Sequence, residues 1–464
     1  MSVTYAQVRE RWTRTLPIIR PGYQYWMMLK ITSCVPRLNF IEGEQNFSIP
    51  YLGIGPTGNG KTEGTNEWAR MCHRGTTQAD NFIRLSLPRE GMSIFGTIPI
   101  PGDELARDAA GQIRFDAETG EPLFTGDKVL TEASSQRYKD LWRRLVKESA
   151  VILMDDASSA VPPEVRTTAM LDFSQTKRMG SIQWRGGDQI ILMANPPEYA
   201  PNTVDWQPAD LGRMFACWMD VGTSREYNTF ESNAFARVFG KAGAYKQAKF
   251  DLTAGRQKAV EAVRDLLPRI QGRVVAYLER HPSAVAGEVP RVNQLAPEFR
   301  KFHLATYALA TAMSQGHAKF AQNDLIEFIE DEEGFSPAVK VLEGLLGKPT
   351  ANEWIGFLPM ISFPSVRDVL DGKEEFEFNP ERPDHAMAFF GELESVVSLD
   401  GPERAKQAAD FMLAQPNSAA DMIMPTLAYL TKGQSPLDYN TMKPVLSKLG
   451  KIRSKTAAGI PTIK

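Results

Sequence analysis

The chain has little cysteine, little histidine and almost no net charge. Its three cysteines, Cys34, Cys72 and Cys217, show no C-x-x-C spacing, which argues against a zinc site or a disulfide framework and suits a reducing cytoplasm. The five histidines are scattered without a His-x-x-x-His pair, so the pattern does not indicate a histidine metal centre. The net charge is −3, so no overall field favours nucleic acid.

Long apolar runs are also missing. No apolar stretch approaches the roughly 18 residues of a membrane-spanning helix, and the first twenty residues lack the apolar core of a signal peptide. We therefore expect a cytoplasmic protein without a membrane segment. With 464 residues, 42% of them apolar and 23% charged, the chain has the composition of a soluble globular protein with two or three domains.

The most informative motif that is present is a complete G-x4-G-K-[ST] phosphate-binding loop. Its residues are Gly55, Pro56, Thr57, Gly58, Asn59, Gly60, Lys61 and Thr62. Glycines allow such a loop to surround phosphates with backbone N–H groups, and the following helix adds its positive amino-terminal end. Lys61 would reach the β- and γ-phosphates, and Thr62 would place its hydroxyl on the metal. Residues 47–54 read as a buried strand and 61–71 as a helix, so the sequence predicts a site for ATP with Mg²⁺.

A second signal lies about 90 residues further on. Residues 150–154 form a continuous apolar run that ends in Asp155 and Asp156. A buried parallel strand that ends in carboxylates is what a Walker B element requires. Asp155 would hold Mg²⁺, through water, and Asp156 would polarise the attacking water. The alternative is a core strand that ends in an ordinary turn.

Two further polar residues follow the next strands. An apolar run over 189–194 ends at Asn195-Pro-Pro, where an amide would orient the hydrolytic water, although Asn-Pro also starts turns. Arg213 lies in a mostly apolar segment before a probable strand over 216–221. It would complete a neighbouring subunit's site by stabilising charge on the γ-phosphate. A surface salt bridge is the other interpretation, and spacing leaves the choice open.

The distribution of strand and helix patterns divides the chain into four parts. Residues 1–46 form a helical amino-terminal segment, and 47–222 alternate strands with helices, as in a parallel α/β sheet. Within this core, 87–127 is rich in glycine and proline and is predicted to form inserted loops or hairpins. Residues 223–348 are predicted to be helical, with a helix over 258–278 broken near Pro268. Residues 349–464 form a mostly helical region that ends in a basic tail, interpreted as a solvated end.

Together these motifs resemble the AAA+ ATPases, and most closely the MoxR-like branch. The resemblance covers roughly residues 45–395. After the Walker B strand, the family's segments correspond here to 160–165, 169–173 and 178–184, followed by the Asn-Pro strand and Leu211–Phe215. Residues 296–302 resemble the lid segment that carries the second sensor arginine, which makes Arg300 a nucleotide-binding residue. Residues 344–347 and 363–372 resemble the segments after the lid.

The resemblance has implications for fold, assembly and partners. It implies an α/β P-loop AAA+ core with a parallel sheet, followed by a helical lid. It implies a ring of identical subunits, with a hexamer as the expected form, with ATP bound between subunits and a chaperone-like role in remodelling a protein partner. In this family the partner often carries a von Willebrand factor A domain. The chain has no Asp-x-Ser-x-Ser motif of that domain, so such a partner would be a separate protein.

One departure from the family keeps two alternatives open. The family has Asp-Glu where this chain has Asp155-Asp156, and the shorter side chain places its carboxylate about 1.5 Å away from the expected position. A displacement near 1 Å can lower a rate about a hundredfold. The chain would then be a nucleotide-gated assembly module with little turnover. A motor acting on nucleic acid is the third hypothesis, which the overall acidity opposes.

Overall fold

The computed structural model describes most of the chain outside the region between residues 87 and 188. The described residues are 3–38, 45–47, 49–72, 82–86, 98–106, 108, 114, 116–119, 121, 123–133, 150–158, 178–179, 182–183, 189–200, 203, 205–241, 243, 246, 248–285, 294–295, 298–416, 419, 423 and 443–448. The family-like segments 160–165 and 169–173 and the tail beyond 448 lie outside them.

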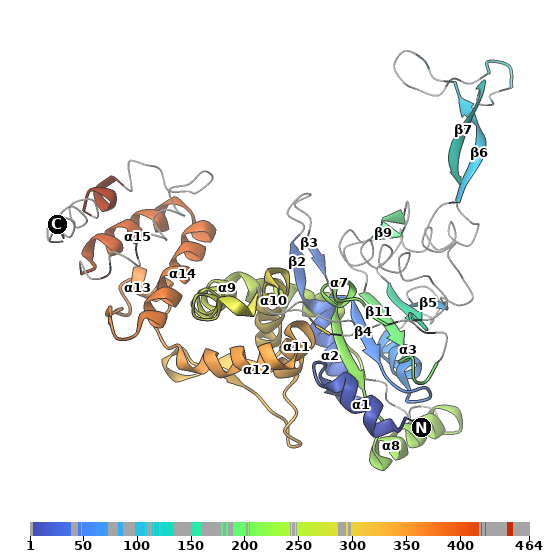
Figure 1. Ribbon diagram of the computed structural model, residues 1–464, viewed down its shortest axis with the longest axis horizontal. Helices are drawn as coiled ribbons and strands as arrows, with labels where there is room; N and C mark the ends of the chain where they lie inside the picture. The colour runs from blue at the N-terminus through green and yellow to red at the C-terminus, as the bar shows by residue number, and fades with distance from the viewer. Residues whose placement is uncertain are drawn as a thin grey trace, which may run out of the picture.

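The core is a six-stranded, fully parallel sheet (Figure 1). Its order is β1-β12-β4-β11-β8-β5. The four central strands are buried along their whole length, which explains why they read as continuous apolar runs rather than as alternating patterns. The bounds are β1 Ile18–Ile19, β4 Tyr51–Ile54, β5 Phe82–Ser86, β8 Val151–Asp155, β11 Gln189–Ala194 and β12 Phe215–Met219.

Helices cover both faces of this sheet. Alternate side chains point to opposite faces, so Leu153 packs into one core with helices α2 and α9, whereas Met154 packs into the other with α1. Helix α3 lies on the α2 face through Trp68. The predicted parallel α/β fold is confirmed. The helices are α1 Tyr5–Thr13, α2 Tyr23–Cys34, α3 Lys61–Cys72 and α9 Leu252–Arg280.

The strand order brings three loop-bearing strand ends together. Strand β11 lies between β4 and β8, with Ala194 opposite Ile54 and Leu192 opposite Met154. The carboxyl ends of parallel strands meet at one edge of a sheet, where ligands of open α/β folds bind. The phosphate-binding loop, Asn195 and the two aspartates therefore converge at this edge.

The amino-terminal segment contributes a strand to the same sheet. After α1, which begins with a capping box between Thr4 and Gln7, β1 pairs in parallel with β12. Helix α2 then packs against one face of the sheet. Its Tyr25 is fully buried, and the Tyr25 hydroxyl forms a hydrogen bond with the Thr65 hydroxyl of α3 at 2.5 Å. Residues 3–38 thus contain the helices α1 and α2, and through β1 they also extend the sheet of the core.

Hairpins flank the core. A long antiparallel hairpin extends away from the sheet (Figure 1); it begins within the predicted insertion over 87–127 and ends beyond it, at Ala133. The hairpins are β2 Pro36–Leu38 with β3 Gln45–Phe47, β6 Ile98–Leu105 with β7 Phe124–Ala133, and β9 Arg178–Met179 with β10 Ile182–Gln183.

The second half of the described chain is mostly helical. Helix α9 runs unbroken through Pro268, so the predicted break is wrong; packing against α10 and α14 holds the helix together despite the missing N–H. Among the described residues, no helix is both long enough and apolar enough to cross a membrane. The elements are α7 Pro208–Leu211, α8 Ser224–Val238, η3 Pro282–Ala284, α10 Phe299–Ser314, β13 Ala318–Phe320, η4 Gln322–Asp324, β14 Ile326–Phe328, α11 Pro337–Leu346, α12 Lys348–Phe357, η5 Leu358–Met360, α13 Val366–Leu370, α14 Pro383–Asp400 and α15 Pro402–Ala414.

Candidate functional site

The phosphate-binding loop connects β4 to α3. Glycine is required at its positions for two different physical reasons. Gly58 and Gly60 adopt φ of +77° and +82°, a region that side chains with a Cβ rarely enter. A Cβ on Gly55 would lie 2.3 Å from the carbonyl oxygen of Met219, so space rather than backbone angle requires glycine there. The backbone N–H of Gly55 also donates to Ala194 at 3.2 Å, which fixes the loop between β11 and β12.

The side chain of Asn59 gives the loop a further attachment that the sequence motif did not predict. Its amide donates to the carbonyl oxygen of Met219 at 2.7 Å, and its Oδ1 accepts from Lys61 at 3.2 Å. Asn59 therefore connects the loop to the end of β12 and contacts Lys61, the lysine of the motif. Any amino acid except proline would leave the backbone N–H groups in place, but few would make both contacts.

Lys61 begins α3 and is nearly buried, with 8% of its surface exposed. Its ammonium group donates to the carbonyl oxygens of Gly55 at 3.0 Å and Pro56 at 2.6 Å, and to Oδ1 of Asn195 at 3.2 Å. Burial lowers the pKa of Lys61 to about 8, although Asp155 and Asp156 act in the opposite direction. The protonated form of Lys61 is thus disfavoured by burial and only partly stabilised by the two nearby carboxylates.

Thr62 and Asp155 form an oxygen-rich pair between α3 and the end of β8. The Thr62 hydroxyl donates to the two carboxylate oxygens of Asp155 at 3.2 and 3.3 Å. Adjacent ligands of an octahedral Mg²⁺ lie about 3 Å apart, since each metal–oxygen bond is about 2.1 Å. The donor set therefore fits Mg²⁺, which takes few protein oxygens and fills its shell with water and phosphate. Within the described chain no cluster of three acidic, histidine or cysteine side chains offers another metal site.

Asn195 links the lysine to the second aspartate. Its Oδ1 accepts from Lys61, and its Nδ2 donates to Oδ1 of Asp156 at 3.3 Å. Asp156 has a left-handed backbone with φ of +55°, a conformation that Asp tolerates better than most residues. Burial raises the pKa of Asp156, as does the neighbouring Asp155, whereas Lys61 and Arg84 lower it. The carboxylate is thus a better proton acceptor than an exposed aspartate.

These groups line a single cleft with a volume of about 380 Å³. The structure brings together the residues that the sequence predicted from the loop and from two strand ends, except that Gly55 and Pro56 of the loop do not line the cleft. The lining residues are Thr57, Gly58, Asn59, Gly60, Lys61, Thr62, Glu63, Asp155, Asp156, Met193, Ala194 and Asn195.

Arg213 and Arg300 lie at the other edge of the sheet. Arg213 precedes β12, whose first residue, Phe215, bonds to Pro50 before the start of β4, so the length of β4 separates Arg213 from the loop. Its guanidinium donates to the carbonyl oxygen of Ala209. Burial lowers the pKa of Arg213, and so does Arg300 nearby. The structure therefore groups the two arginines with each other, and neither lines the cleft of its own chain.

A buried lysine holds the start of α10 at this second edge. Lys301 follows Arg300, is fully buried, and donates to the carbonyl oxygen of Met214 at 2.9 Å. Burial lowers its pKa to about 7. The contact joins the helical region to the junction between α7 and β12. It accounts for the closeness of Arg213 and Arg300, which lie 87 positions apart in the sequence.

The sequence analysis did not predict two charged residues here: Glu63, which lines the cleft, and Arg84, which contacts Asp155. Arg84 of β5 donates to Oδ2 of Asp155 at 2.5 Å. The only signal for it was an arginine within a short strand pattern. Its significance appears only when β5 pairs with β8, with Ser86 opposite Asp155.

Comparisons with known proteins give limited information. No protein-family model matches the chain, and no curated protein matches it. Among solved structures, it is similar to the crystal structure of a "putative ATPase" from Cytophaga hutchinsonii ATCC 33406. The two chains are 13% identical, and the match covers 80% of this chain and 94% of that chain with a TM-score of 0.40. The α/β P-loop fold described above accordingly rests on the sheet and the loop themselves.

Proposed function

We propose that this chain binds ATP with Mg²⁺ in the cleft at the carboxyl edge of its sheet. The observation that carries the proposal is the convergence of Lys61 and Thr62 from the loop with Asp155 and Asn195 from two adjacent strands. The loop's N–H groups and Lys61 would hold the phosphates. Thr62 and Asp155 would hold Mg²⁺, which when bound neutralises charge on the phosphate oxygens.

We further propose that the chain hydrolyses ATP. Asp156 would accept the proton of the attacking water, since its raised pKa makes it a stronger base than an exposed aspartate. Asn195 would fix the orientation of Asp156 through the 3.3 Å hydrogen bond. This bond supports the assignment of Asn195 as part of the site rather than as the start of a turn.

The proposed assembly is a ring of identical subunits in the cytoplasm, with the MoxR-like role of remodelling a protein partner. Arg213 and Arg300 lie together at the sheet edge away from their own cleft, where a neighbouring subunit's phosphates would be within reach only in an assembly. A separate protein with a von Willebrand factor A domain is the proposed kind of partner. The cytoplasmic location is supported by three free cysteines.

A nucleotide-gated module with little turnover is the second candidate. Its support is Asp156 itself, which is shorter than the family's glutamate and is held by Asn195 within the wall of the cleft. In this case the chain would bind ATP and change its contacts with a partner. Slow hydrolysis of ATP would return it to the starting state.

Two substitutions test these proposals. Lys61→Ala should abolish ATP binding, measured by titration calorimetry, because it removes the cation of the loop. Asp156→Asn should preserve binding and lower turnover by about a hundredfold. Lys319→Ala, an exposed lysine on β13 paired with Glu327, is the control and should change neither. ATP binding that survives in Lys61→Ala would refute the site, and unchanged turnover in Asp156→Asn would refute the role of that carboxylate.

If the parent protein turns over ATP no faster than Lys61→Ala while binding it tightly, the second candidate replaces the first. Mass photometry with and without ATP tests the assembly separately. A mass that stays at one subunit at all nucleotide concentrations would refute the ring.

A further inference from the structure

Arg84 approaches the metal-binding carboxylate from outside the cleft. It lies on β5, the edge strand next to β8, between the buried residues Ile83 and Leu85. Its guanidinium extends along the strand to Asp155, which is opposite Ser86 in the sheet register. Arg84 is absent from the residues that line the cleft. Asp155 is therefore contacted by Thr62 of the loop helix and by Arg84, and its Oδ2 accepts from both.

The two partners of this ion pair differ in their freedom to move. The side chain of Asp155 is 13% exposed, whereas that of Arg84 is 53% exposed. A half-exposed arginine can leave its partner for water at little cost, since exposed ion pairs contribute weakly to stability. The carboxylate cannot do the same, because the cleft wall encloses it.

The cleft holds three acidic side chains, because Glu63 lines it together with Asp155 and Asp156. Asp155 and Asp156 face two cations, Lys61 and Arg84, which both act on Asp156 electrostatically. A divalent cation at Thr62 and Asp155 brings two further positive charges to a carboxylate that already has a guanidinium at 2.5 Å. Arginine does not relieve this repulsion by losing its proton, because it stays charged in proteins. It can relieve it only by moving away.

We propose that Arg84 is a counterion that competes with Mg²⁺ for Asp155 and thereby sets the divalent-cation concentration at which the cleft binds nucleotide. The inference rests on the proposed ATP site and extends it to a regulatory residue of that site. Arg84 holds Asp155 when divalent cation is scarce. Mg²⁺ would replace it at Asp155, and the released guanidinium would turn to the solvent, to which the Arg84 side chain is already half exposed.

A purely supporting role for Arg84 predicts the opposite sign. Residues that hydrogen-bond a metal ligand often orient it, and their loss weakens metal binding about 10- to 100-fold. Competition predicts that loss of Arg84 strengthens metal binding. The direction of the change therefore decides between the two roles.

The experiment is a metal titration of Arg84→Gln. Binding of Mn²⁺ to the full-length protein is followed by electron paramagnetic resonance, first without nucleotide and then with a non-hydrolysable ATP analogue. We expect the half-saturating Mn²⁺ concentration to fall about tenfold, because one positive charge next to a divalent ion is removed at a half-exposed position. Arg84→Lys keeps the charge and should stay within about threefold of the parent. Arg70→Gln removes an arginine that pairs with Glu67 away from the cleft and should leave the titration unchanged.

An unchanged or higher Mn²⁺ requirement in Arg84→Gln would overturn the proposal. The titration without nucleotide separates this outcome from failure of the proposed function. If the parent binds Mn²⁺ but no ATP analogue, the ATP site is wrong while the competition is still measured. If both ligands bind and Arg84→Gln matches the parent, only the role of Arg84 is wrong.

Discussion

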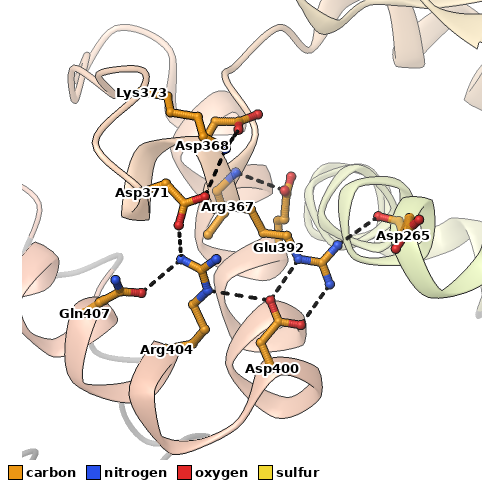
Figure 2. A network of polar contacts seen from close by, with 10 residues as sticks. Asp265, Arg367, Asp368, Asp371, Lys373, Glu392, Asp400, Arg404 and Gln407 are labelled. Atoms are coloured by element: carbon orange, nitrogen blue, oxygen red, sulfur yellow. Dashed lines mark hydrogen bonds and ion pairs between the residues drawn. The ribbon is translucent and has the colours of Figure 1, made fainter.

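The cleft and the junction between α9 and α14 use the same kinds of charged residues in opposite ways. In the cleft, Lys61, Asp155 and Asp156 face an open volume of about 380 Å³. At the junction the charges close on one another. Figure 2 shows Arg367 of α13 paired with Asp400 of α14 and reaching the backbone of Asp265 on α9.

The interior of the junction shows that a shifted pKa does not by itself mark a functional site. Arg273 is fully buried, donates to the carbonyl oxygen of Asp324 at 2.7 Å and lies over the ring of Phe363. Burial raises the pKa of Glu392 to about 7 against the pull of two arginines, a shift as clear as that of Lys61. What distinguishes the cleft is the space that its groups share, since perturbed pKa values also occur in structural networks.

The largest expected effect on stability comes from adding a side-chain atom where the two helices of the junction approach most closely. A Cβ on Gly272 of α9 would lie 2.2 Å from the carbonyl oxygen of Ala388 on α14, so Gly272→Ala should force the helices apart and lower stability by about 3 kcal/mol. Gly356→Ala is the control, since its Cβ would meet no atom within 4 Å and alanine favours helix. Chemical unfolding measures both. Equal midpoints for the two variants would show that the junction is not closely packed.

Sequence reasoning recovered the parts of the molecule that local patterns determine. The loop, the strand ending at Asp155 and the turn at Asn195 each have a short-range signal, and parallel pairing then brings them together. Residues 223–348 and 349–464 were likewise predicted to be largely helical, and α10, α14 and α15 lie within these ranges.

The rest depends on contacts between distant segments. Nothing near Arg84 in the sequence indicates that it meets Asp155, because that contact exists only through the register of β5 with β8. The pairing of Ile18–Ile19 with β12 is equally non-local, and a two-residue strand has no periodicity to detect. Pro268 was misjudged because tertiary packing of α9 overrides the local preference of proline.

The second prediction tests whether the charge of Lys61 is as finely poised as its environment indicates. Burial lowers its pKa to about 8, and phosphate binding requires the protonated form. ATP affinity should therefore fall as the pH rises through about 8, approaching tenfold per pH unit once the free protein must take up a proton to bind. Lys61→Arg keeps its charge over this range and should remove the slope even if its affinity is lower. Titrations between pH 7 and 10 measure both, and a flat parent profile would contradict the prediction.

The smallest expected effect lies in the surface network of the junction. Arg367 contacts both oxygens of Asp400, at 2.9 and 3.0 Å, with about a quarter of each side chain exposed. These contacts raise the pKa of Arg367, but solvent screening limits what the pair contributes to stability. Arg367→Ala should lower stability by about 1 kcal/mol or less and leave ATP affinity unchanged, because the network has no shared space for a ligand. The loss of stability should be smaller in high salt.

Lys373→Ala, which removes an exposed member of the same network, should have no measurable effect on unfolding. A change in ATP affinity in Arg367→Ala would show instead that the junction is coupled to the cleft. The charges of the junction could then no longer be treated as purely structural.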